Sequence, residues 1–206
     1  MNEMRKMLPN INQVRIGADL NALKLIKEPE CAAVILLREP ISKFTNWIDE
    51  LDVEMLPAAK EILRPESVRK FLVDICKNSG LENGPECAHL IDNITRLSDA
   101  FSELVDSSFI RIRLEKITTN ACKKFHIDNV KVRLVCTYRG TGTQYGCAKN
   151  GENPENIYTV PTGCPFLMRG RLWSDEADSE LVHRSPPIEG LGQTRLLLVI
   201  DPIFER

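Results

Sequence analysis

The sequence has no feature of a membrane protein or a secreted protein. No apolar run approaches the roughly 20 residues that a helix needs to cross a bilayer, and the longest candidates have the length of a strand: Ala32–Leu37 and Leu196–Ile200. The first residues, Met1–Arg15, have neither a continuous apolar segment nor a small-residue cleavage site, so we expect no secretory signal. These absences predict a cytoplasmic protein with no membrane partner.

An excess of charge of one sign is also missing. The chain has 206 residues, with 27 Lys and Arg against 29 Asp and Glu, and its formal net charge is -2. Binding to a phosphate backbone normally needs a clear excess of Lys and Arg, so we expect no nucleic-acid partner. The length is enough to bury a sizeable core, and it predicts a single domain over residues 1–206.

Closely spaced cysteines are absent, and histidines are scarce. The seven cysteines are odd in number and form no Cys-x-x-Cys pair, so neither a disulfide framework nor a zinc finger is indicated. In a reducing cytosol they would be core thiols or metal ligands. His is a common metal ligand and the usual acid or base near neutral pH, so each of the three is a candidate for a functional role: His89, His126 and His183.

Two common catalytic motifs are missing as well. There is no Gly-x-Ser-x-Gly motif, and no Ser or Cys is placed with a His and an acid by any family pattern, so covalent hydrolase chemistry is not supported. The stretch Gly140–Thr143 lacks the Lys and the helix that follow a phosphate-binding loop, and we interpret it as a hairpin turn.

The periodicity of apolar residues changes near residue 108. Before this point the spacing predicts amphipathic helices over Pro85–Val105, from Pro65 to Gly80, and over Pro40–Leu51. After it, apolar and polar residues alternate, as in half-buried strands, from Ile110 and again from Val130.

Further short apolar runs are separated by Gly, Pro and Asn clusters, and Ala32–Leu37 could add a strand to the same sheet. The pattern predicts an α+β fold: a mainly helical part over residues 1–108, packed on a β-rich core of the jelly-roll type over residues 109–206.

The residues with the clearest chemical meaning are His126, Asp128 and His183. In an extended chain, His126 and Asp128 point to the same face, so an imidazole and a carboxylate can converge on one metal ion. His183 lies far downstream at the end of a short apolar strand, and two His with one Asp make the facial triad that holds Fe(II). Arg195 opens the next strand and could present its guanidinium to a carboxylate.

This arrangement resembles the 2-oxoglutarate/Fe(II)-dependent oxygenases, whose double-stranded β-helix of the cupin type carries His-x-Asp, a distal His and then a basic residue. The resemblance covers about residues 109–203. It implies metal ligands at His126, Asp128 and His183, and a salt bridge from Arg195 to the far carboxylate of 2-oxoglutarate. It also implies that Tyr138 supplies a hydroxyl to the same cosubstrate. Arg195 is followed by two leucines, so the Arg-x-Ser form of some branches is absent.

A closer similarity is to the family called domain of unknown function 1826. It rests on Cys122–Val130, on Arg133–Gly140 and on Val182–Pro187, together with the strand Arg195–Asp201. Members of that family are often encoded beside zinc-homeostasis genes, which implies a role under metal limitation. No biochemical activity comes with the family name.

Alternatives remain open at this point. His126 could be a surface histidine with Asp128 capping a turn. Zinc could instead take Cys122 as a fourth ligand, which would make a non-catalytic metal-binding protein, or the metal could act only as a Lewis acid in a cupin-type isomerase or hydrolase. His89 lies beside the apolar stripe of a predicted helix, and we assign it no role.

Basic residues gather around the predicted site, and most of them are expected on a solvated sheet face: Lys123, Lys124, Lys131, Arg133 and Arg139. Arg184, next to the distal histidine, is the best candidate for contacting the substrate, whether that is a small molecule or a protein. The sequence does not identify the substrate.

Overall fold

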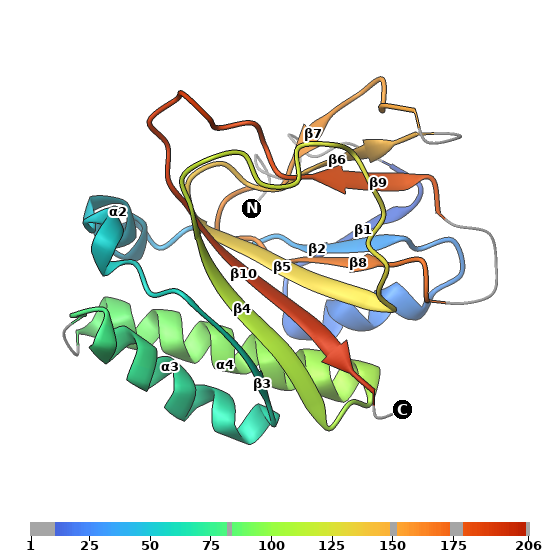
Figure 1. Ribbon diagram of the computed structural model, residues 1–206. Helices are drawn as coiled ribbons and strands as arrows, with labels where there is room; N and C mark the ends of the chain where they lie inside the picture. Colours follow the sequence, from blue (N-terminus) through green and yellow to red (C-terminus); the bar gives the residue numbers. More distant parts are fainter. Residues whose placement is uncertain (1–10, 82–83, 149–151, 174–178, 205–206) are drawn as a thin grey trace.

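The computed structural model describes residues 11–81, 84–148, 152–173 and 179–204. Within them, the strands form two sheets, with orders β1-β2-β8-β5-β10-β4-β3 and β7-β6-β9 (Figure 1). The strands of the larger sheet are β1 (Val14–Gly17), β2 (Ala33–Leu36), β3 (Ala59–Leu63), β4 (Phe109–Ile117), β5 (Val132–Arg139), β8 (Phe166–Arg169) and β10 (Arg195–Ile203). Those of the smaller sheet are β6 (Gln144–Cys147), β7 (Tyr158–Thr159) and β9 (Leu181–Arg184).

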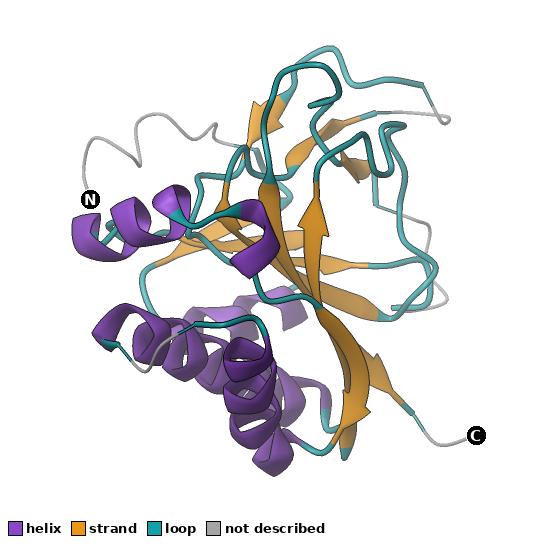
Figure 2. Ribbon diagram, turned by 60° about the vertical axis from the view of Figure 1, so that its left-hand side comes forward, coloured by secondary structure: helices purple, strands orange, loops and turns teal. Residues whose placement is uncertain are grey.

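The helices come from the first half of the chain, and Figure 2 shows the α-helices on one side of the large sheet. The longest, α4 (Pro85–Val105), contacts β4, β10 and the neighbouring α3 (Val68–Asn78). The others are α2 (Ser42–Glu50) and the 3-10 helices η1 (Leu20–Lys27), η2 (Val53–Met55) and η3 (Pro65–Ser67). Among the described residues, no helix is long and apolar enough to span a membrane.

Strand β10 lies between β4 and β5 and pairs antiparallel with both. Because successive side chains of a strand point to opposite faces, its apolar run contributes to two separate cores. Leu196, Leu198 and Ile200 join the core shared with the helices. Leu197 and Val199 join a second core, together with residues of the smaller sheet. The uninterrupted apolar run Leu196–Ile200 therefore reflects burial on both faces of the sheet.

The structure confirms the helices that the periodicity predicts. The stretch Pro85–Val105 is α4, and the segment from Pro65 forms η3 followed by α3. The predicted strand at Ala32–Leu37 is β2, which pairs with β1 and β8. The fold is therefore a mixture of helices and strands with a large sheet.

The first half of the chain is less purely helical than the sequence suggests, because it also supplies β1, β2 and β3 to the large sheet. Strand β3 lies at the sheet edge and pairs only with β4. Its three central residues are exposed, so it shows no alternation of apolar and polar residues that could reveal it. The change in apolar periodicity near residue 108 is therefore not a boundary of the large sheet, because strands from both sides of it belong to this sheet.

Removal of a side chain from the centre of the sheet should destabilise the protein. Leu198 is fully buried on β10, so we expect Leu198→Ala to lower the free energy of unfolding by about 2–5 kcal/mol. Leu191 is 63% exposed, and Leu191→Ala should change it by no more than about 0.5 kcal/mol. Urea denaturation followed by circular dichroism measures both. Equal effects of the two substitutions would contradict the assignment of β10 to the core.

Candidate metal centre

A backbone bridge brings the two histidines of the predicted triad together. His126 lies in the connection between β4 and β5, whereas His183 lies on β9 of the smaller sheet. The amide N–H of each donates to the carbonyl of the other, at 3.0 Å in both directions, which is an isolated antiparallel bridge. Their ring centroids are 4.5 Å apart. The tertiary pairing of two distant segments therefore places both imidazoles on one side.

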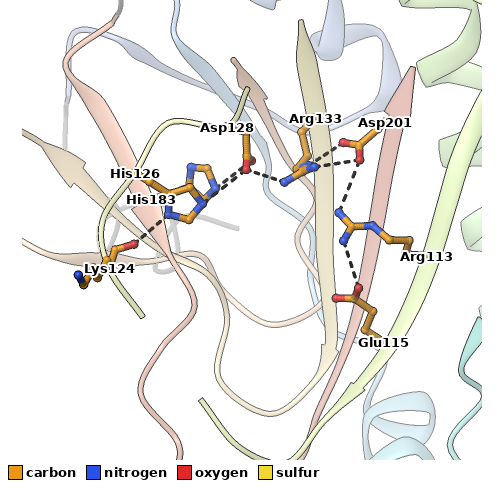
Figure 3. A network of polar contacts seen from close by, with 8 residues as sticks. All are labelled: Arg113, Glu115, Lys124, His126, Asp128, Arg133, His183 and Asp201. Carbon is orange, nitrogen blue, oxygen red and sulfur yellow. Dashed lines mark hydrogen bonds and ion pairs between the residues drawn. The ribbon is translucent and has the colours of Figure 1, made fainter. Parts of the chain in front are cut away.

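Asp128 completes the cluster from the same connection as His126 (Figure 3). One ligand atom from each of the three residues can be chosen so that all lie within 4.8 Å of one another. Asp128 Oδ1 lies 3.5 Å from His126 Nε2, and Oδ2 lies 3.1 Å from His183 Nε2. The side chain of His126 is 35% exposed against 12% for that of His183, so the cluster is open to solvent beside His126.

The donor atoms suit a divalent metal ion. His126 Nδ1 lies 2.8 Å from the carbonyl of Lys124, and because a carbonyl only accepts, Nδ1 donates and leaves the lone pair of Nε2 for a metal. Asp128 Oδ2 is buried and receives no hydrogen bond of good geometry in the described part of the chain. Two imidazoles and one carboxylate make the set that binds Fe(II) in facial triads.

Asp128 and His183 favour the protonation states that metal binding needs, whereas the raised pKa of His126 favours its imidazolium, whose proton a metal must displace. Burial alone would raise the pKa of Asp128, but its close contacts with the imidazoles of His126 and His183 and the charge of Arg133 hold it well below its ordinary value. Burial lowers the pKa of His183, which favours the neutral imidazole. The close contact with Asp128 raises the pKa of His126. A carboxylate and a neutral imidazole are the forms that coordinate a metal.

Arg133 connects the cluster to the large sheet. Its Nη1 lies 2.6 Å from Asp128 Oδ1, while its Nε and Nη2 donate to the two oxygens of Asp201 at 2.6 and 2.9 Å. Asp201 is also 3.5 Å from Arg113, which pairs with Glu115 (Figure 3). The basic cluster in the sequence was interpreted mainly as a solvated face, and Arg133 departs from that interpretation. No sequence motif distinguishes it from its basic neighbours.

Arg195 is fully buried at the start of β10. Its Nε donates to the carbonyl of Thr141 at 2.7 Å, and its Nη1 and Nη2 donate to the hydroxyls of Ser185 and Thr137, both at 3.2 Å. All these partners are neutral, and no carboxylate of the described residues forms a salt bridge with it. Burial lowers the pKa of Arg195 to about 10. A guanidinium held among neutral groups is suited to pairing with the carboxylate of a ligand.

The structure does not bring Tyr138 to this cluster. Its hydroxyl donates to Asn93 Oδ1 of α4 at 2.6 Å, and its ring packs against Phe44 of α2. The preceding residue, Thr137, contacts Arg195, and consecutive strand residues point to opposite faces. The hydroxyl of Tyr138 is thus on the helical side of the sheet.

Arg184 and Cys122 also lie outside the group of potential metal ligands. Arg184 donates from Nε to Gln144 at 2.8 Å, and its guanidinium lies over the ring of Phe125 at 4.5 Å. Cys122 is exposed and is not part of the His126, Asp128 and His183 group, so the geometry gives no support to a zinc site with a cysteine ligand.

The fold is similar to that of 2-oxoglutarate/Fe(II) oxygenases. Dioxygenase for auxin oxidation 1 from Arabidopsis thaliana, solved with 2-oxoglutarate, superposes with a TM-score of 0.57 at 8% identity, covering 95% of this chain and 94% of that chain. The dioxygenase for auxin oxidation from rice gives a TM-score of 0.52 at 9% identity, covering 94% of this chain and 84% of that chain. At such identities the likeness concerns the fold alone.

The family follows from the sequence itself. Residues 17–201 match the family described as "Protein of unknown function (DUF1826)", and the chain therefore belongs to the DUF1826 family. No curated protein matches the chain. The similarity to this family and to the oxygenases, expected from the residues around His126 and His183, is confirmed.

Loss of the carboxylate of Asp128 should change the stability of the metal-free protein in a pH-dependent way. A carboxyl whose native pKa is lowered stabilises the fold above its unfolded pKa, near ~3.9, and this stabilisation is lost as the pH falls through the native pKa. We expect Asp128→Asn to lower the free energy of unfolding by about 1–3 kcal/mol at pH 7. The difference in this free energy between the variant and wild type should narrow below about pH 4.

Urea denaturation with a chelator at several pH values measures this difference. Asp74→Asn, at an exposed position of α3, is the matched control and should have little effect at any pH. If the difference in unfolding free energy between wild type and Asp128→Asn grew as the pH fell below about 4, the pKa of Asp128 could not be lowered in the native state.

Removal of Arg133 should affect both stability and metal binding. Arg133→Met leaves the buried carboxylates of Asp128 and Asp201 without their shared partner, which should cost about 3–5 kcal/mol. Loss of the contact that orients a metal ligand should weaken Mn(II) binding about 10–100-fold. Calorimetric titration measures the affinity. In Asp201→Asn, Arg133 can still hold Asp128, so Mn(II) affinity should stay closer to wild type; equal losses in both variants would contradict this role.

Proposed function

We propose that the protein is a 2-oxoglutarate/Fe(II)-dependent oxygenase with His126, Asp128 and His183 as its metal ligands. The observation that carries the proposal is the combination of this cluster with a buried guanidinium, Arg195, that has no acidic partner among the described residues. The proposal includes the finer description of the fold, a cupin-type double-stranded β-helix packed against an N-terminal helical layer.

Each ligand residue has a defined part in this proposal. His126 and His183 would bind the metal through Nε2, and Asp128 through Oδ2, because Oδ1 is occupied by Arg133. Three protein ligands leave the remaining positions of Fe(II) open for cosubstrate, substrate and oxygen. Bound Fe(II) would supply oxygen activation coupled to the oxidative decarboxylation of 2-oxoglutarate. The chain's own contribution is to orient these ligands and to keep one side of the cluster open.

Arg195 would hold the far carboxylate of 2-oxoglutarate. Its contact with Ser185, two residues after His183, places it near the strand that carries the distal metal ligand. The hydroxyls of Thr137 and Ser185 and the carbonyl of Thr141 hold the guanidinium in one orientation. Burial without a countercharge is costly, and a bound carboxylate would relieve that cost. The Arabidopsis dioxygenase of similar fold was solved with 2-oxoglutarate, which supports the same cosubstrate here.

The first test is an anaerobic titration of the metal-free protein with Fe(II) and then with 2-oxoglutarate. We expect the weak visible charge-transfer band of the chelate to appear only when both are present. His183→Ala should abolish the band and weaken Mn(II) binding at least 100-fold, since it removes one of the three ligands. Tight metal binding without any band would overturn the use of 2-oxoglutarate.

Substitution of Arg195 separates cosubstrate binding from metal binding. Arg195→Met should leave Mn(II) affinity within about threefold of wild type and weaken 2-oxoglutarate binding at least tenfold, a loss of about 1.4 kcal/mol or more. Arg184→Met is the matched control, because Arg184 contacts Gln144 and Phe125 instead. Calorimetry on the Mn(II)-loaded protein measures each affinity. Equal 2-oxoglutarate binding in the Arg195 and Arg184 variants would refute the assignment.

A further inference from the structure

A polar cavity, separate from the His126, Asp128 and His183 cluster, lies on the helical side of the large sheet. It has a volume of about 90 Å³ and lies where α2, α4 and strand β5 meet the segment after β2. Its walls include a guanidinium, an imidazole, an amide and a phenol, from Arg38, His89, Asn93 and Tyr138. None of these side chains belongs to the metal cluster.

The positive charge of Arg38 has no acidic partner among the residues that the structure describes. Its Nε donates to the carbonyl of Gly163 at 2.5 Å, and its Nη2 lies 3.1 Å from Asn93 Oδ1 and 3.6 Å from Cys136 Sγ. These partners are neutral as long as the thiol is protonated, and burial raises the pKa of Cys136 to about 11. The guanidinium of Arg38 therefore forms no ion pair within the described residues, and a carboxylate-bearing residue, Glu39, also lines the cavity.

Several donors beside this charge remain available. Asn93 Oδ1 accepts from both Tyr138 and Arg38, which orients the amide and leaves its Nδ2 as a donor. In the described part of the chain, Asn93 Nδ2 and Arg38 Nη1 make no hydrogen bond. Neither of these two atoms is fully buried. Both residues line the cavity, so these N–H groups can serve a ligand there.

His89 adds a further donor from the next turn of α4. Its ring meets the edge of Phe44 at a centroid distance of 4.9 Å. Burial and the nearby charge of Arg38 lower the pKa of His89, so it is neutral at pH 7 and still carries one N–H. Beside Glu39, the cavity thus offers a guanidinium without an ion-pair partner among the described residues and neutral donors next to it, a combination that can bind an anion.

Size and surroundings limit which anion fits. The cavity has a volume of about 90 Å³, so the part of a ligand that enters it is limited to a few heavy atoms. Pro40, Ile41 and Phe44 make part of the wall apolar. Glu39, another lining residue, adds negative charge that disfavours a dianion. A short carboxylate with a small apolar end satisfies all three conditions.

We propose that this cavity is a binding site for a small monocarboxylate, held by Arg38 with Asn93 and His89. The site is separate from the metal centre, because Tyr138 faces the cavity while the adjacent Thr137 contacts Arg195 on the other face of β5. The inference does not depend on the proposed oxygenase activity.

Acetate is the probe for this site, and Trp47 is the reporter. The chain has two tryptophans. The ring centroid of Trp47 lies 5.9 Å from that of Phe44, which is part of the cavity wall. In a Trp173→Phe background, titration of metal-free, chelator-treated protein with acetate should change the fluorescence of Trp47 saturably, with a millimolar Kd. Phosphate at the same ionic strength should not reproduce the change.

The decisive variant is Asn93→Asp, which keeps the size of the side chain but places a carboxylate against Arg38. It should weaken acetate binding at least tenfold by balancing the charge and repelling the anion. Asn78→Asp, at an exposed position of α3, makes the same chemical change elsewhere and should bind acetate as wild type does. Arg195→Met should also retain binding, which separates this site from the proposed cosubstrate site.

Circular dichroism should show that Asn93→Asp is folded. Absence of a saturable response in the wild-type background would overturn the proposal, and so would equal acetate affinity in the Asn93 and Asn78 variants. Loss of the response in Arg195→Met alone would assign acetate to the metal-centre side of the sheet and would equally overturn it.

Discussion

The guanidinium of Arg133 bonds the carboxylates of Asp128 and Asp201 at once, and it links the group of His126, Asp128 and His183 to the large sheet. Asp201 belongs to the central strand β10, so Arg133 ties Asp128, which lies in a connection outside the sheet, to the most buried part of the fold. The contact also occupies Oδ1 of Asp128 and leaves Oδ2 without a hydrogen bond from the described residues, and Oδ2 is the oxygen that binds the metal in the proposed function. A loop carboxylate is thereby given the orientation that a coordinating group needs.

The two faces of strand β5 carry different chemistry. Arg133 and Thr137 are on the face that contacts Asp128 and Arg195, whereas Tyr138 joins the core shared with the helices. Each side of the sheet holds an arginine with neutral partners, Arg195 on one and Arg38 on the other. Because an uncompensated charge away from water is costly, such residues are candidates for binding a ligand that supplies the opposite charge. Under the two proposals, one sheet carries two separate anion sites on its opposite faces.

Much of the fold was predictable where local patterns are strong. The apolar stripe of Pro85–Val105 is long enough to predict this helix from the sequence. The alternation of apolar and polar residues from Ile110 likewise predicts β4. The edge strand β3 was not predictable, because its residues are mostly exposed and its pairing with β4 is the main reason that it is a strand. The role of Arg133 was missed for a similar reason, since its two acidic partners come from distant segments.

The sequence by itself determined the family and the helices, and it singled out His126, Asp128 and His183 as candidate ligands, because these depend on residue type and on short-range spacing. The tertiary structure alone decided that His126 and His183 form a backbone bridge and that Arg195 is buried among neutral groups. It also decided that Tyr138 faces the helices and that Arg38 lines a second cavity. These facts depend on which strands become neighbours and which face of the sheet a side chain occupies, and a shift of one residue in register would reverse the face.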